Sequence, residues 1–185
     1  MAAIKGICKG SRNLLLLYLN YTTLLFPYVE VLRQHRKGKN GKEYQTIQDM
    51  LDYEVTNNLI KKKGKDYTAG TTNLLRIHRA LEFIIEFLKG VPGLNPDDKS
   101  CPLAQEAYKK TLKKHHPWMV QKAALLAMHT LPFKKVLVEK ISGQPFGSDE
   151  YKAAENILPH GVKVMGEVYE KINEVYKKYD VINLP

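Results

Sequence analysis

The residues from Asn73 to Leu131 set the strongest limit on what this chain can fold into. Apolar side chains recur there every three to four residues, the spacing that places them on one face of an α-helix. In the first half these are Leu74, Ile77, Leu81, Ile84, Ile85 and Leu88, opposite a polar stripe of Arg79, Glu82, Glu86 and Lys89. No stretch of the 185 residues alternates convincingly between apolar and polar residues as a strand would. We therefore expect an all-α protein.

Arg76 stands at the head of an apolar row on the first of these helices. The residues that follow it at i+4, i+7 and i+11 are Ala80, Phe83 and Phe87. An arginine in such a place is more often one whose stem covers apolar surface while its charge reaches water. The alternative is a ligand-binding arginine, because a guanidinium offers paired donors to a phosphate. Spacing alone favours the first interpretation.

His116 continues a row that begins with Tyr108 and Leu112. Pro117 disfavours helical geometry at His116 and suits the start of a new helix. We therefore expect His116 at a junction between two helices, facing inward, with Trp118 close by. An isolated inward histidine is more often a hydrogen-bonded core residue than a ligand. Composition and spacing thus predict a basic helical domain with a candidate anion site.

Four segments resemble the glycolipid transfer protein superfamily: LLRIHRALEF, AYKKTLKKHHPW, VQKAALLAMHTLP and DVINLP. The resemblance runs from about residue 43 to residue 185. It is strongest to the branch of ceramide-1-phosphate transfer proteins and their domain-containing relatives. It implies a two-layer helical sandwich that encloses an apolar lipid pocket. It also implies transfer of one sphingolipid between membranes without catalysis, with ceramide-1-phosphate as the expected cargo.

The resemblance also assigns roles to single residues. Arg76 matches an arginine that binds the lipid phosphate, and His116 matches a histidine that hydrogen-bonds the ceramide amide region. Trp118 matches a tryptophan of the membrane-docking surface. The other residues expected at that surface are Met119, Lys113 and Lys122. The residues expected to line the pocket for the lipid chains are Ala80, Phe83, Phe87, Leu112, Ala124 and Met128.

The sequence departs from the family pattern in two places. The family's phosphate site also uses an aspartate and a lysine one helical turn apart. The matching window, near residues 24–28, reads Leu-Leu-Phe-Pro-Tyr. Thr72 replaces a further arginine one turn before Arg76. A second hypothesis therefore stays open, a degenerate family member that acts as a membrane- or protein-interaction module without lipid transfer.

The chain is expected to form a single domain. Residues 1–42 are an atypical N-terminal segment that we expect to add a helix to it, and residues 43–185 form the family-like part. Residues 14–26 are apolar but interrupted by polar residues, and they are too short for a confident membrane span. Further helices are expected over residues 43–63, 118–131, 133–141, 149–158 and 161–180. The acidic side chains expected in solvent on the first of these are Asp49, Asp52 and Glu54.

The net charge and the sequence motifs limit the classes of binding partner that we expect. The formal net charge is +10, from 29 Lys and Arg against 19 Asp and Glu, which favours anionic membrane surfaces or nucleic acid. No helix-turn-helix pattern or aromatic–basic interleaving supports nucleic acid. Glycine-rich phosphate loops, zinc-binding spacings and nucleophile signatures are missing from the sequence, so we expect no enzyme activity, cofactor or metal. We expect a cytoplasmic monomer that binds membranes peripherally and reversibly.

Overall fold

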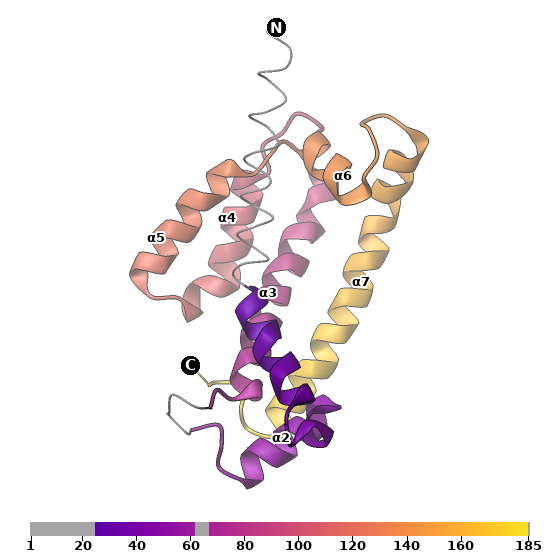
Figure 1. The fold of residues 1–185 in the computed structure, drawn as a ribbon. Coiled ribbons are helices and arrows are strands. Elements are labelled where there is room, and N and C mark those ends of the chain that lie inside the picture. The colour runs from indigo at the N-terminus through magenta and orange to yellow at the C-terminus, as the bar shows by residue number, and fades with distance from the viewer. Residues whose placement is uncertain (1–24, 62–66, 185) are drawn as a thin grey trace, which may run out of the picture. The chain divides into compact units, whose positions relative to one another are not determined.

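The computed structural model describes residues 25–61 and 67–184, and every multi-residue regular element among them is helical (Figure 1). Residues 25–37 form the first described helix. The elements that follow are η1 (Gly41–Tyr44), α2 (Ile47–Thr56), α3 (Gly70–Gly90), η2 (Val91–Gly93), α4 (Cys101–Lys110), η3 (Leu112–His115), α5 (Trp118–Ala127), η4 (Met128–Thr130), α6 (Lys134–Ser142) and α7 (Asp149–Lys178), where η marks a 3-10 helix. The prediction of an all-α protein is confirmed.

The chain divides into two compact units. The first contains residues 1–78 and 170–185, and the second contains residues 79–169. The boundaries fall within α3 and within α7. The apolar segment 14–26 lies outside the described residues except for Leu25 and Phe26. That residues 1–42 and 43–185 form one domain stays a prediction.

The first unit contains a buried carboxylate, Glu54 of α2. Its Oε1 accepts hydrogen bonds from the hydroxyls of Tyr44 and Tyr67, at 3.0 and 2.6 Å. The backbone amides of Gly70 and Thr71 donate to its two oxygens, at 2.7 and 2.9 Å. These amides begin α3 and have no partner within that helix. Glu54 therefore caps the N-terminus of α3 with a negative charge, the sign that a helix N-terminus favours.

The expectation that Glu54 lies in solvent was wrong, because its side chain is 0% exposed. A carboxylate tolerates such burial only when hydrogen bonds replace its water. Burial raises the pKa of Tyr44 and, with the hydrogen bond to Glu54, that of Tyr67, so both phenols stay protonated and donate. Gly70 permits the close approach, since a Cβ there would lie 2.7 Å from Met50 Sδ and 3.3 Å from Glu54 Oε1.

An apolar cluster ties α2, the start of α3 and the end of α7 together. Its buried members are Leu51, Leu75, Tyr176 and Val181. The hydroxyl of Tyr176 donates to the carbonyl of Thr71 at 2.8 Å, and its ring stacks on His78. The first two turns of α3 are therefore held by the cap and by this cluster.

Helix α2 is shorter than the predicted helix over residues 43–63. Thr46 caps its start by accepting a hydrogen bond from the amide of Asp49 at 3.1 Å. At its end the side chain of Asn57 donates to the carbonyl of Tyr53, and Asn58 has a left-handed backbone with φ 53°. Both are features that end helices.

A single helix, α7, replaces the two helices predicted over residues 149–158 and 161–180. It continues through Pro159, although a proline removes one backbone hydrogen bond and crowds the preceding turn. Tyr151 is buried on one side of the proline and Val162 on the other. Packing of both turns outweighs the local cost of the proline.

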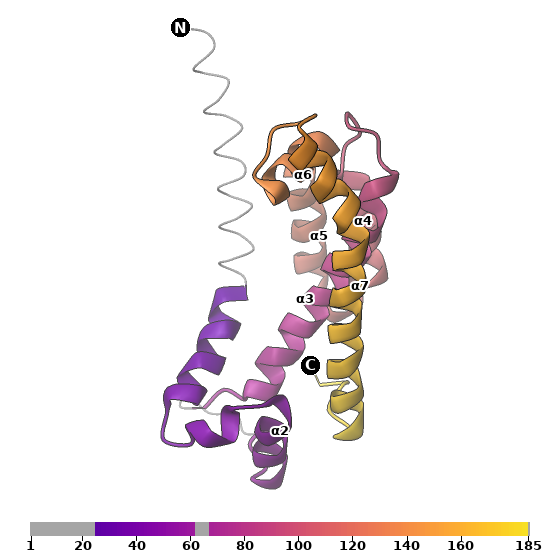
Figure 2. The ribbon, with the colours of Figure 1, turned by 90° about the vertical axis from the view of Figure 1, so that its right-hand side faces the viewer.

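In the second unit, α6 lies beside the first part of α7 (Figure 2). Val138 and Tyr151 are buried there together with Val91. Lys134 is buried at the start of α6, where its ammonium pairs with the Glu155 carboxylate. The same ammonium donates to the carbonyl of Leu94 at 2.8 Å. This lysine therefore holds the loop after η2 against α6 and α7.

The burial of Glu54 predicts a large effect of its removal. In Glu54→Ala two phenols and two helix-terminal amides lose their acceptor, so the free energy of unfolding should fall by about 3 kcal/mol. Urea unfolding followed by circular dichroism measures the change. The control is Glu174→Ala, an exposed carboxylate on α7, which should cost less than about 0.5 kcal/mol. Equal losses in the two variants would contradict the capping role.

Candidate functional site

Arg76 lies in the second turn of α3 and is exposed. Its guanidinium carbon is 5.3 Å from the centre of the Tyr28 ring, a cation–π contact. Sequence analysis missed this contact, because Tyr28 stands 48 positions away and carried no pattern that links it to α3. The Tyr28 ring thus holds the Arg76 side chain in place, while Arg76 remains exposed to solvent. That combination suits the binding of an anion.

His116 occupies the predicted junction, between η3 and α5, and is half-buried. Its Nδ1 lies 2.9 Å from the hydroxyl of Tyr108, as their common row in the sequence indicated. The side chain of Gln121 donates to the His116 carbonyl at 2.8 Å, which fixes the start of α5. Burial lowers the pKa of His116, so its ring is neutral at pH 7. A neutral imidazole has one donor and one acceptor nitrogen.

A second histidine and an arginine lie beside this junction. Burial, the charges of Arg79 and Lys114 and the neighbouring His116 together lower the pKa of His115 to about 4, and burial is the largest of these causes. Arg79 is buried, although the helical pattern placed it in the polar stripe with Glu82. Sequence analysis found no signal for this arrangement, because the pattern of one helix does not show what packs against it.

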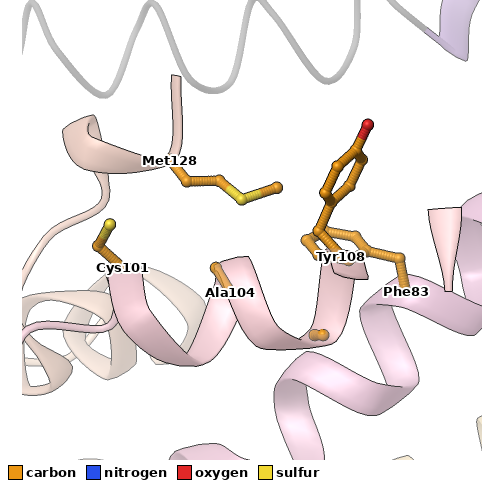
Figure 3. Packing of buried hydrophobic residues seen from close by; sticks show 6 residues of the cluster. Phe83, Cys101, Ala104, Tyr108 and Met128 are labelled. Carbon is orange, nitrogen blue, oxygen red and sulfur yellow. The ribbon is translucent and has the colours of Figure 1, made fainter. Parts of the chain in front are cut away.

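Five of the six residues predicted to line the lipid-chain pocket belong to one apolar cluster in the second unit. Phe83 and Met128 are buried members, and Figure 3 shows Met128 pointing toward Tyr108 and Phe83. The partly buried members among the predicted residues are Phe87, Leu112 and Ala124. Ala80 is half-buried on α3. The cluster joins α3, α4, α5 and η4, and its role as a pocket wall stays a prediction.

The residues predicted to dock on membranes lie at and before the start of α5. Trp118 is 69% exposed and Met119 is 75% exposed, which is unusual for such large apolar side chains. Lys113 and Lys122 are also exposed, and the Lys122 ammonium lies 5.8 Å from the centre of the Trp118 ring. Apolar and cationic side chains therefore share one surface, which fits the interface of an anionic membrane.

A family model described as Glycolipid transfer protein (GLTP) matches residues 28–143, more than half of the chain. The chain belongs to the glycolipid transfer protein family. A ceramide-1-phosphate transfer protein of Xenopus laevis is 33% identical over 159 residues, which cover 85% of this chain and 72% of the relative. Another from Danio rerio is 30% identical over 159 residues, covering 85% of this chain and 73% of the relative.

Solved structures of the glycolipid transfer protein family share the fold. Human ceramide-1-phosphate transfer protein in complex with 12:0 ceramide-1-phosphate superposes with a TM-score of 0.81 at 24% identity, covering 100% of this chain and 87% of that one. The apo form of the mouse protein gives a TM-score of 0.81 at 25% identity, with the same coverage. The fold is therefore all-α and of the glycolipid transfer protein type.

Arg76 belongs to the first unit and His116 to the second, and the roles that the family resemblance gives them stay predictions.

Within residues 25–61 and 67–184, no helix is both long and apolar enough to cross a membrane. Among the same residues, no group of three or more histidine, cysteine, aspartate or glutamate side chains is placed to hold a metal ion.

The lowered pKa values of His115 and His116 make folding depend on pH. Between about pH 6.5 and pH 4 the unfolded chain binds more protons than the folded one, so stability should fall as pH falls through this window. Histidine NMR titration should place His115 near pH 4, and Lys114→Gln should raise its pKa. A His115 midpoint at the ordinary value of about 6.5 would contradict the lowered pKa expected from its surroundings.

Proposed function

We propose that this chain carries a sphingolipid between membranes and that ceramide-1-phosphate is its cargo. Membership of the glycolipid transfer protein family supports transfer, because the relatives from Xenopus laevis and Danio rerio are ceramide-1-phosphate transfer proteins. The observation that carries the choice of cargo is Arg76, an exposed arginine held on a capped helix. Transfer of a lipid between membranes requires only that the lipid is bound and released, so we propose no catalytic step and no cofactor.

Arg76 is the proposed ligand of the phosphate. A guanidinium is planar, stays charged at physiological pH and presents parallel N–H donors that match two phosphate oxygens. The Glu54 cap fixes the start of α3, six residues before Arg76. The side chain therefore projects from a rigid helix toward solvent, where a headgroup can reach it.

His116 is the proposed ligand of the ceramide amide. When the Tyr108 hydroxyl donates to Nδ1, the hydrogen of the neutral ring lies on Nε2. That hydrogen can be donated to an amide carbonyl. A neutral donor suits the site because the amide carries no charge, and a buried imidazolium would be costly. We propose that Tyr108 sets this tautomer.

The lipid chains need an apolar enclosure. Two chains with a total of roughly 30 methylene groups cost on the order of 20 kcal/mol to expose to water, at about 0.8 kcal/mol each. The apolar cluster of α3, α4, α5 and η4 is the proposed wall. Its members Phe83, Phe87 and Met128 supply large or adaptable side chains that can repack around a chain.

Membrane docking is proposed at Trp118 and Met119, with Lys113 and Lys122 beside them. An indole favours the boundary between headgroups and acyl chains, and the lysines favour anionic lipids. The net charge of +10 adds attraction that is screened by salt. We propose reversible, peripheral association with the cytoplasmic faces of membranes, by a monomer.

Removing the charge of Arg76 tests the headgroup assignment. Transfer of fluorescent ceramide-1-phosphate between phosphatidylcholine vesicles is compared with transfer of fluorescent galactosylceramide. The native chain should prefer the phosphate lipid, and Arg76→Leu should lose that preference while keeping its helical circular dichroism. Loss of one charge-assisted contact of about 1.5–3 kcal/mol corresponds to roughly a tenfold to a hundredfold change. Lys89→Leu, at an exposed lysine on the same helix, is the control and should change little.

Unchanged selectivity in Arg76→Leu would rule out the headgroup role. Failure of the folded native chain to transfer either lipid would overturn the transfer proposal in favour of an interaction module. Binding to vesicles of different composition further separates a lipid-transfer protein from an interaction module. A preference for ceramide-1-phosphate over equally charged phosphatidylserine that persists in salt indicates a specific site, whereas purely electrostatic binding fades as salt screens it.

The docking surface makes its own prediction. In Trp118→Ala, partitioning onto anionic vesicles should fall by on the order of tenfold, because burial of a large apolar side chain is worth about 1.5–3 kcal/mol. Vesicle flotation measures the partition. Ile157→Ala removes a similarly exposed apolar side chain from α7, 63% exposed, and should have little effect. Equal losses in both variants would show that no particular surface docks.

A further inference from the structure

Two contacts place the helix of residues 25–37 against the start of α3. His35 Nε2 lies 2.7 Å from the carbonyl of Thr68, and the His35 ring stacks on Tyr44 with centres 4.5 Å apart. Tyr28, seven residues before His35, contacts Arg76, eight residues after Thr68. The first segment is helical from Tyr28 to His35, and the second is helical from Gly70 to Arg76. The end of the first segment contacts the start of the second, and Tyr28 near the start of the first contacts Arg76 further along the second, so the two segments run antiparallel.

That anchored end is joined to the hydrogen bonds of Glu54. Tyr44, on which His35 stacks, donates to the buried Glu54 carboxylate, and Glu54 caps α3. The same network therefore fixes the segment that carries Tyr28 and the helix that carries Arg76. The contact between Tyr28 and Arg76 is therefore linked to the buried hydrogen bonds of Glu54 through the stack of His35 on Tyr44.

The contact with Tyr28 leaves Arg76 exposed to solvent. An aromatic ring attracts a cation over its face, and the Arg76 carbon lies 5.3 Å from the Tyr28 ring centre. All five N–H donors of a guanidinium lie in its plane and point outward from its edges. The attraction to the ring limits the positions that the guanidinium takes. Arg76 is exposed, so an anion can approach those edges.

We infer that Tyr28 is a positioning residue for Arg76 and that it selects headgroups presenting two anionic oxygens together. This inference rests on the proposed function, because it concerns the same headgroup site. A phosphate has two such oxygens at the spacing of the guanidinium donors, and a neutral sugar has none. Holding the guanidinium in place reduces the entropy lost when both bonds form. Tyr28 therefore acts on selectivity through Arg76.

The ring, not the hydroxyl, is the part that the inference requires. Tyr28→Leu removes the ring, and Tyr28→Phe keeps it. Tyr28→Met fills the space with a flexible apolar side chain and serves as the second ring-free variant if the leucine variant folds poorly. Thermal unfolding followed by circular dichroism shows which variants are folded before transfer is measured.

The test is the ratio of ceramide-1-phosphate transfer to galactosylceramide transfer, measured with fluorescent lipids in phosphatidylcholine vesicles. An exposed cation–π contact predicts a fall in this ratio of about two- to fivefold in Tyr28→Leu and Tyr28→Met. Tyr28→Phe should keep the native ratio. In an Arg76→Leu background the loss of the ring should have no further effect, because nothing is left to position.

The outcomes separate this inference from the proposed function. A native chain that shows no phosphate preference, with Arg76→Leu unchanged, overturns both. A native preference that Arg76→Leu abolishes but Tyr28→Leu and Tyr28→Met leave intact overturns the role of Tyr28 alone. Equal losses on removing the ring with and without the Arg76 charge also overturn it, since they indicate a general structural effect. Loss that depends on Arg76 and is absent in Tyr28→Phe supports it.

Discussion

A carboxylate with no solvent contact accepts hydrogen bonds from the first two amides of α3, and the geometry of the first unit depends on this interaction. The start of a helix is where unpaired amides and a positive partial charge coincide. Placing Glu54 there compensates its burial and fixes where α3 begins. Arg76 lies six residues later, so its direction around the helix is set as well. His35 contacts the same hydrogen-bond network through Tyr44, so the helix that contains His35 is positioned by that network as well.

In the second unit, His116 lies next to an apolar cluster without carrying a charge. Pro117 breaks the helix and brings His116 to the edge of that cluster, where Tyr108 provides a hydrogen-bond partner. Burial lowers the pKa of His116, and burial with nearby cations lowers that of His115. Both rings are therefore neutral donors and acceptors at physiological pH. A neutral ring beside apolar side chains can bind an amide and release it again, because no desolvated ion is left behind.

The sequence predicted what depends on local spacing and missed what depends on contacts between distant residues. Apolar periodicity predicted helices, and Pro117 predicted the junction at His116, because both act within one or two helical turns. Glu54 looked solvated since its partners Tyr67, Gly70 and Thr71 lie beyond its own helix. Pro159 suggested two helices, whereas burial on both sides of it keeps α7 continuous. The contact of Tyr28 with Arg76 has no local signature at all. Periodicity singled out Arg76 and His116 but favoured ordinary structural explanations for both, and the resemblance gave them binding roles.

The family pattern places charged residues where this chain reads Leu-Leu-Phe-Pro-Tyr, and the structure shows what one of the replacements contacts. An aromatic ring adds no charge to a headgroup site, so Tyr28 cannot increase the Coulomb attraction for a phosphate. It can restrict the position of a guanidinium, and this effect acts only at contact distance. Attraction from the net charge of +10 is long-ranged and is screened beyond about 8 Å at physiological ionic strength. Charge would then govern how fast the chain reaches an anionic membrane, whereas the Tyr28–Arg76 pair would govern which headgroup it removes. The first quantity should respond strongly to salt and the second only weakly.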